Sequence, residues 1–153
     1  MPPVPDPQAG QAFKEATAMT IPGLTTHRSA FDPAQTADRL AAAIQSRGLT
    51  LFARVDHAAG AAAVGLPLRP TELLMFGNAK GGTPLMQAAQ TIGIDLPLRA
   101  LVWQDEAGTT WLGTNDPAWL AQRHGIGAAA DTTVNAIRTL LGALAREATA
   151  TPA

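Results

Sequence analysis

The sequence contains neither cysteine nor tyrosine, and each absence excludes a kind of chemistry. Without cysteine the chain cannot form a disulfide, use a thiol nucleophile, or bind zinc or an iron–sulfur cluster through thiolates. Without tyrosine it has no phenolic acid or base. The lack of cysteine leaves the compartment open, because a protein without thiols is compatible with both the cytoplasm and the periplasm.

Charged residues are also scarce, at 15% of the chain with a net charge of −1. Lys14 and Lys80 are the only lysines, and the basic residues are scattered singly along the sequence. Nucleic-acid binding relies on clustered lysine and arginine, so we expect no nucleic-acid partner. No apolar run approaches the roughly 20 residues of a membrane-spanning helix, so we expect a soluble chain with no membrane partner.

The length of 153 residues is typical of a single domain. Residues 1–23 are expected to form a flexible N-terminal tail and lead-in, because four prolines fall in the first ten residues. The start as written has no basic segment followed by an apolar one, so it shows no secretory signal. Whether a signal was removed stays open. We expect one α+β domain over residues 24–147 and a frayed C-terminus over residues 148–153.

Helix and strand patterns alternate along this domain. Asp32 and Pro33 are typical of an N-cap and a first helical residue, and an apolar stripe of helical spacing follows them. The segment that follows Gly48 alternates apolar and polar residues, as a half-buried strand does. We expect helices over residues 33–47, 58–64, 85–91, 117–124 and from 131 onward, and strands over residues 49–56, 72–76, 101–105 and 109–113. This order favours an α+β fold over a doubly wound parallel sheet.

The last two strands carry the most specific local signal, which is that of a β-hairpin. Glu106-Ala107-Gly108 separates them, and a three-residue loop ends in a left-handed residue that glycine adopts without steric cost. If Asp105 faces Thr109, Trp103 must face Trp111 on the adjacent strand. The sequence therefore predicts a cross-strand tryptophan pair.

Several longer motifs carry a family resemblance. They are Val55 to Ala58, Leu68 to Asn78, Gly82 to Met86, Gly93 to Arg99, Asn115 to Pro117 and Arg123 to Gly125. In this order they closely resemble the family called "domain of unknown function 302", over roughly residues 24–147. The chain departs from the family at Ala79, where proline is common, and at Thr114, where tyrosine is common.

The resemblance implies a small α+β fold like the TATA-binding-protein half-domain, with an antiparallel sheet and helices packed on one face. It also implies frequent dimerisation, so we expect a homodimer. It implies no established activity, and the cofactor stays unknown.

Polar motif residues lie at the ends of three expected strands, after two of them and before the third. These residues are His57, Asn78, Lys80, Asp95 and Arg99. If the three strand ends meet, the five side chains line one pocket of a small-ligand binding module. An anion would suit the backbone N–H groups of the glycine-rich segment 77–82, and haem would need one axial ligand such as His57.

Alternatives remain for each of these assignments. Segment 77–82 lacks the features of a P-loop or a dinucleotide fingerprint, so it is also consistent with a tight turn. Asp95 would then cap a loop, Arg99 would pair with Asp95 or Glu72, and Lys80 would be a solvated surface charge. For His124 we expect a favourable interaction with a helix dipole, and for His27 a surface position.

Two other functions stay open at this point. The first is a small-molecule enzyme with His57 as general base and Lys80 or Arg99 as anion-binding groups. The second is a purely structural dimer whose motif residues only hold turns together. The three histidines lie far apart in the sequence, so no metal site is predicted.

Overall fold

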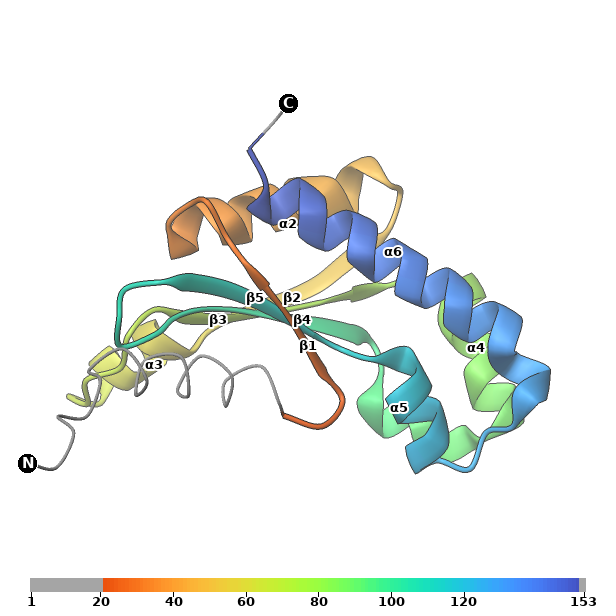
Figure 1. Cartoon of the computed structure of the whole chain (residues 1–153). Helices are drawn as coiled ribbons and strands as arrows, with labels where there is room; N and C mark the ends of the chain where they lie inside the picture. Colours follow the sequence, from red (N-terminus) through yellow and green to blue (C-terminus); the bar gives the residue numbers. More distant parts are fainter. Residues whose placement is uncertain (1–20, 152–153) are drawn as a thin grey trace, which may run out of the picture.

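The computed structural model describes residues 21–151 of the chain. Its centre is a five-stranded antiparallel sheet with the strand order β1-β5-β4-β3-β2 (Figure 1). In chain order the elements are β1 (Leu24–Arg28), α2 (Pro33–Ser46), β2 (Thr50–Asp56), α3 (His57–Ala63), β3 (Thr71–Gly77), α4 (Ala79–Ala88), the 3₁₀ helix η1 (Gln90–Asp95), β4 (Leu98–Gln104), β5 (Thr110–Asn115), α5 (Pro117–Arg123), the 3₁₀ helix η2 (Ala128–Ala130) and α6 (Asp131–Thr149). The predicted α+β class with an antiparallel sheet is confirmed.

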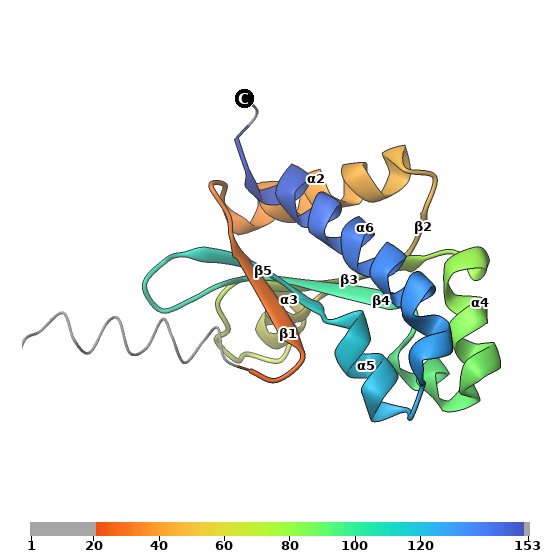
Figure 2. The same ribbon diagram turned by 45° about the vertical axis from the view of Figure 1, so that its right-hand side comes forward.

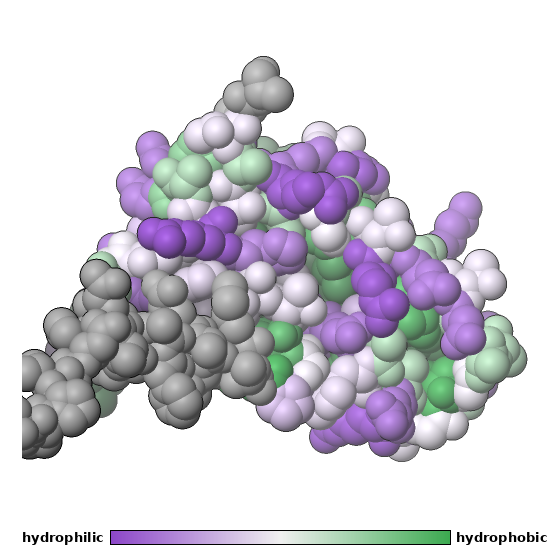
Figure 3. Space-filling model, viewed as in Figure 1, coloured by the Kyte–Doolittle hydropathy of each residue, from purple (hydrophilic) through white to green (hydrophobic). Residues whose placement is uncertain are grey.

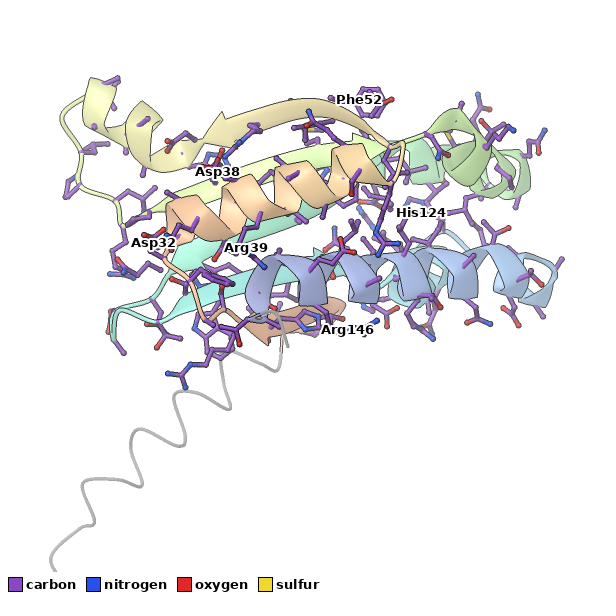
Figure 4. All side chains as sticks on the ribbon, turned by 90° about the horizontal axis from the view of Figure 1, so that it is seen from above. Asp32, Asp38, Arg39, Phe52, His124 and Arg146 are labelled. Carbon is purple, nitrogen blue, oxygen red and sulfur yellow. The ribbon has the colours of Figure 1, made fainter. Side chains whose placement is uncertain are left out.

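The core lies between one face of the sheet and the helices α2 and α6. Figures 1 and 2 show both helices over this face, and Figure 4, seen from above, shows them side by side. Alternate residues of the central strands point toward them and are almost completely buried, namely Leu74, Phe76, Ala100, Val102 and Leu112. Because side chains alternate between the two faces of a strand, the residues between them point away from α2 and α6.

The remaining helices lie at the two ends of the sheet. Helices α4 and α5 lie at one end, and α3 lies at the other (Figure 1). Helix α2 begins as predicted, since the Asp32 carboxylate accepts the Gln35 amide at 2.8 Å. Asp116 caps α5 in the same way, by accepting the Ala118 amide at 2.9 Å.

The predicted hairpin between β4 and β5 is confirmed. Trp103 is paired with Trp111, and Gly108 ends the loop with a φ of 82°. The Asp105 carboxylate closes the turn, because it accepts the Trp111 indole N–H at 2.8 Å and the Thr109 amide at 2.9 Å. Burial alone would raise the pKa of Asp105, but these donors hold its pKa below the usual range.

One segment near the N-terminus of the domain differs from the predictions. Leu24–Arg28 forms β1, an edge strand paired with β5, although the sequence pattern predicts no strand there. Its sequence has only one large apolar residue, Leu24, so it lacks the alternation that reveals a half-buried strand. His27 on this strand is partly buried rather than a surface residue, and this burial, together with the nearby Arg146 charge, lowers its pKa. The expected tail of residues 1–20 lies outside the described residues.

Two helix boundaries also differ. Helix α4 begins at Ala79 rather than at residue 85, because the Asn78 side chain caps it by accepting the Gly81 amide at 2.7 Å. The glycine-rich segment is therefore mostly the first turn of a helix, and Pro84 lies inside that helix. At the other terminus, α6 runs to Thr149 with both Ala148 and Thr149 buried, past residue 147 where we expected the domain to end.

Candidate functional site

A pocket of about 640 Å³ lies at the end of the sheet that carries α4. Its walls come from the start of β2, the end of β3, α4, the segment from η1 to β4, and the first half of α6. Figure 3 shows apolar surface reaching the outside at this end of the molecule. The larger apolar side chains that line it are Leu49, Phe52, Phe76, Met86, Leu96, Pro97, Leu98, Ile137 and Leu140. The pocket is therefore mainly apolar.

Four polar side chains interrupt this apolar lining. They are Asn78, Lys80, Thr132 and Thr133. Lys80 is the one charged side chain among the lining residues that the structure describes, and none of the ion pairs found among residues 21–151 involves it. It lies in the first turn of α4, where backbone N–H groups lack partners within the helix and the helix dipole is positive. The polar part of the pocket therefore favours an anion.

The expected convergence of three strand ends is wrong for His57. Strands β2 and β3 are antiparallel, so Thr50 pairs with Gly77 whereas Asp56 pairs with Glu72. Six residues of extended strand span about 20 Å, which places His57 at the end of the sheet opposite to Asn78. His57 is exposed there at the start of α3, and the Asp56 carboxylate caps this helix by accepting the Ala59 amide at 2.9 Å.

Asp95 belongs to a cluster that the sequence analysis did not assemble. Its carboxylate oxygens accept two hydrogen bonds from Nη1 of Arg123, both at 2.8 Å, and Oδ2 lies 2.6 Å from Nε2 of His124. The other ring nitrogen of His124 lies 2.9 Å from Oγ1 of Thr91. His124 is thus a buried partner of Asp95 at the C-terminal cap of α5, and not only a residue near a helix dipole.

Arg99 joins neither the pocket nor this cluster. It pairs with Met75 across β3 and β4, on the sheet face that points away from α2 and α6. Its guanidinium donates to the Ile94 carbonyl at 3.2 Å. The two carboxylates expected to bind it have other partners, since Asp95 binds Arg123 and Glu72 binds Arg54 at 2.6 Å.

The Asp95 cluster and the pocket share one segment of chain. Gly93, Leu96, Pro97 and Leu98 line the pocket, whereas Asp95 points to α5. The ion pair of Asp95 with Arg123 and its hydrogen bond with His124 therefore hold the pocket wall against α5. A signal for this cluster was present in the sequence, because Gly93 to Arg99 and Arg123 to Gly125 are both among the motifs of the family resemblance.

The chemistry of these groups limits what each can do. The lining of the pocket in the described residues has no imidazole, so haem ligation by His57 does not fit it. Thr91, His124 and Asp95 lie in the order hydroxyl, imidazole, carboxylate, but none of them lines the pocket. Over residues 21–151, no group of three histidine, aspartate or glutamate side chains is placed to hold a metal ion.

Curated relatives match this chain over most of its length. A Brucella suis biovar 1 protein named "Fluoride-specific ion channel FluC 1" is 51% identical over 126 residues, which is 82% of this chain and 50% of the relative. A Brucella abortus protein of the same name matches with the same identity over 47% of its length. The chain thus spans about half the length of the curated relatives it matches. Within the described residues, no helix has the length and apolar character needed to cross a membrane.

A solved structure and a family model agree on the fold. The crystal structure of an uncharacterized conserved DUF302 protein from Bacillus stearothermophilus aligns with a TM-score of 0.74, over 84% of this chain and 99% of that chain. Its sequence identity is 19%, so this likeness shows the fold alone. The family model described as "Domain of unknown function DUF302" matches residues 25–144. The chain is a member of the DUF302 family.

Proposed function

We propose that this domain binds a small, largely apolar molecule that carries one anionic group, in the pocket between α4 and α6. The supporting observation is the pocket itself, with its volume of about 640 Å³, its apolar walls and its single lysine. Small-molecule sites are typically concave, mainly apolar, and about 300–1,000 Å³ in volume, with a few polar groups that orient the ligand. In this pocket, Lys80 and the first turn of α4 supply those groups.

Binding fits the site better than acid–base catalysis does. A general base must lie within hydrogen-bond reach of the proton that it removes. The described lining residues include no histidine, aspartate or glutamate. His57, the base of the enzyme hypothesis, lies about 20 Å away along the sheet. A purely structural role would suit Asp95, whose partners are internal, and Asn78, which caps α4. It leaves the position of Lys80 in the pocket lining without a purpose.

The test is a fluorescence titration with anilinonaphthalene sulfonate, a probe with apolar rings and one sulfonate. Ala136 is an exposed residue of α6 that lines the pocket, so Ala136→Trp should fill the pocket without disturbing the core. Thr139→Trp, on an exposed position of the same helix outside the lining, is the matched control. We expect the wild type and the control to bind the probe and Ala136→Trp to lose it. Equal binding by all three folded proteins would refute the proposal.

We also propose that the domain acts together with a fluoride channel. The curated Brucella relatives support this, because a region 51% identical to this chain makes up about half of proteins named fluoride-specific ion channels. An in-frame deletion of the region that encodes residues 21–151 should make the host more sensitive to fluoride, and a wild-type copy should restore tolerance. Unchanged tolerance and unchanged intracellular fluoride in the deletion strain would disprove this association.

The expected homodimer is likewise a proposal, and β2 is its best candidate contact. This edge strand carries Phe52 and Val55, which are 57% and 39% exposed, and Figure 4 shows Phe52 at the outer edge of the sheet. An exposed apolar edge strand is a template for pairing with another chain. Native mass spectrometry should show a dimer, and Val55→Lys should shift it toward the monomer. A monomeric wild type at micromolar concentration would contradict the proposal.

A further inference from the structure

We infer that the ligand class of this pocket is an unbranched acyl carboxylate of about the length of decanoate. The inference rests on the binding function proposed above and adds the shape and the head group of the molecule. Three features of the pocket carry it: the length of the wall that α6 provides, the flexible side chains in the rest of the lining, and the single charge at the pocket.

The α6 wall is long and narrow. Its lining residues are Thr132, Thr133, Ala136, Ile137 and Leu140, which all lie on one face of the helix because they recur at helical spacing. From the first to the last of them, the helix rises about 12 Å. An extended acyl chain of about ten carbons has a similar length, because its carbon–carbon bonds measure about 1.5 Å and zigzag along the chain. An elongated ligand therefore matches this wall.

The rest of the lining is apolar and partly flexible. Met86, Leu96 and Leu98 are part of it, and methionine adapts its shape to irregular apolar partners. At two glycines the backbone lies near these side chains. A Cβ at Gly82 would lie 3.5 Å from Cδ1 of Leu96, and one at Gly93 would lie 3.4 Å from Sδ of Met86. Such a lining can follow a flexible alkyl chain along its length.

The head group follows from charge. Lys80 is the single charged side chain in the described lining and is exposed, so it lies where the pocket meets solvent. Burying an unpaired charge is costly, so the carboxylate would stay at Lys80 while the alkyl chain enters the apolar part. One lysine balances one carboxylate. A ligand with two acidic groups would leave the second one unpaired.

The experiment is a displacement series with the bound anilinonaphthalene sulfonate as reporter. Straight-chain carboxylates from hexanoate to hexadecanoate are compared with the matching primary alcohols, below their micelle concentrations. We expect the tightest displacement near decanoate. We also expect each carboxylate to bind roughly fivefold more tightly than its alcohol, since a partly exposed ion pair contributes up to about 1 kcal/mol.

Two variants separate charge from shape. Lys80→Met should remove the preference for carboxylate over alcohol while the optimal chain length stays the same. Arg28→Met, which removes an exposed cation on the distant edge strand β1, is the matched control and should keep the preference.

The possible failures are distinguishable. If the probe binds and Ala136→Trp excludes it, but no carboxylate displaces it, this inference is wrong and the proposed function stands. Tighter displacement by branched or polycyclic acids, or equal displacement by alcohols, would also overturn the inference. If neither the probe nor any carboxylate binds the folded wild type, the proposed function fails as well.

Discussion

Removing the Asp95 carboxylate should destabilise the domain far more than the loss of an ordinary surface ion pair. Asp95→Ala deletes the acceptor of His124, whose side chain is only 8% exposed, and the acceptor of Arg123, which is 51% exposed. A hydrogen bond to a charged group contributes about 1.5–3 kcal/mol. The exposed arginine pair adds at most about 1 kcal/mol.

We therefore expect Asp95→Ala to lower the free energy of unfolding by about 2–4 kcal/mol. For a domain of this size the midpoint of thermal unfolding should fall by roughly 5–15 °C. The matched control is Glu147→Ala, which breaks the exposed pair between Glu147 and Arg47. Its cost should not exceed about 1 kcal/mol.

The assay is urea unfolding followed by circular dichroism. A double-mutant cycle with His124→Ala should give a coupling energy of at least about 1 kcal/mol, because the two side chains are in direct contact. Because Asp95 anchors the segment that lines the pocket, the folded Asp95→Ala protein should also bind the fluorescent probe more weakly. The reasoning is refuted if Asp95→Ala is no less stable than Glu147→Ala, or if the coupling energy is near zero.

Three further outcomes follow from other parts of the structure. Asp105→Asn should lower the free energy of unfolding at pH 7. The difference in stability between this variant and the wild type should shrink as the pH falls below about 4, because the pKa of Asp105 is lowered by folding and protonation removes the stabilisation that its carboxylate gives the wild type. Urea midpoints measured across this pH range test the expectation. Gly23→Ala should lower the melting temperature, because φ is +75° and the new Cβ would clash with the indole ring of Trp119. An unchanged melting temperature would contradict the close approach of Gly23 to this ring. Because the pKa of His27 is lowered by folding, the folded protein binds a proton at this imidazole less readily than the unfolded chain does. The melting temperature should therefore fall as the pH drops through about 6.5. His27→Gln should reduce that fall in melting scans.

Local signals in the sequence predicted those elements that depend on neighbouring residues. Asp32 and Asp116 mark helix starts because a cap acts on amides two or three residues away. The tryptophan pair of the hairpin follows from the length of its loop, which fixes the pairing of both strands. Strand β1 was missed because an edge strand is held mainly by backbone hydrogen bonds to β5, which leave no pattern in the side chains.

The site could not be assembled in the same way, because it depends on the direction of strands that local sequence does not specify. The prediction grouped His57 with Asn78 since each follows a strand. That grouping requires the two strands to be parallel, and in the antiparallel pair β2–β3 their C-terminal ends lie at opposite ends of the sheet. Asn78 and Lys80 do line one pocket, together with residues from the start of β4, and ligand binding by them stays a prediction.

The η1–β4 segment explains why one short motif serves both the cluster and the pocket. Its residues point in three directions: Asp95 binds α5, the stretch from Leu96 to Leu98 lines the pocket, and Arg99 points to the opposite sheet face. A displacement of α5 must therefore move the pocket wall, because the two are joined through a carboxylate with three short contacts. The pocket is thus mechanically tied to α5 through the Asp95 cluster.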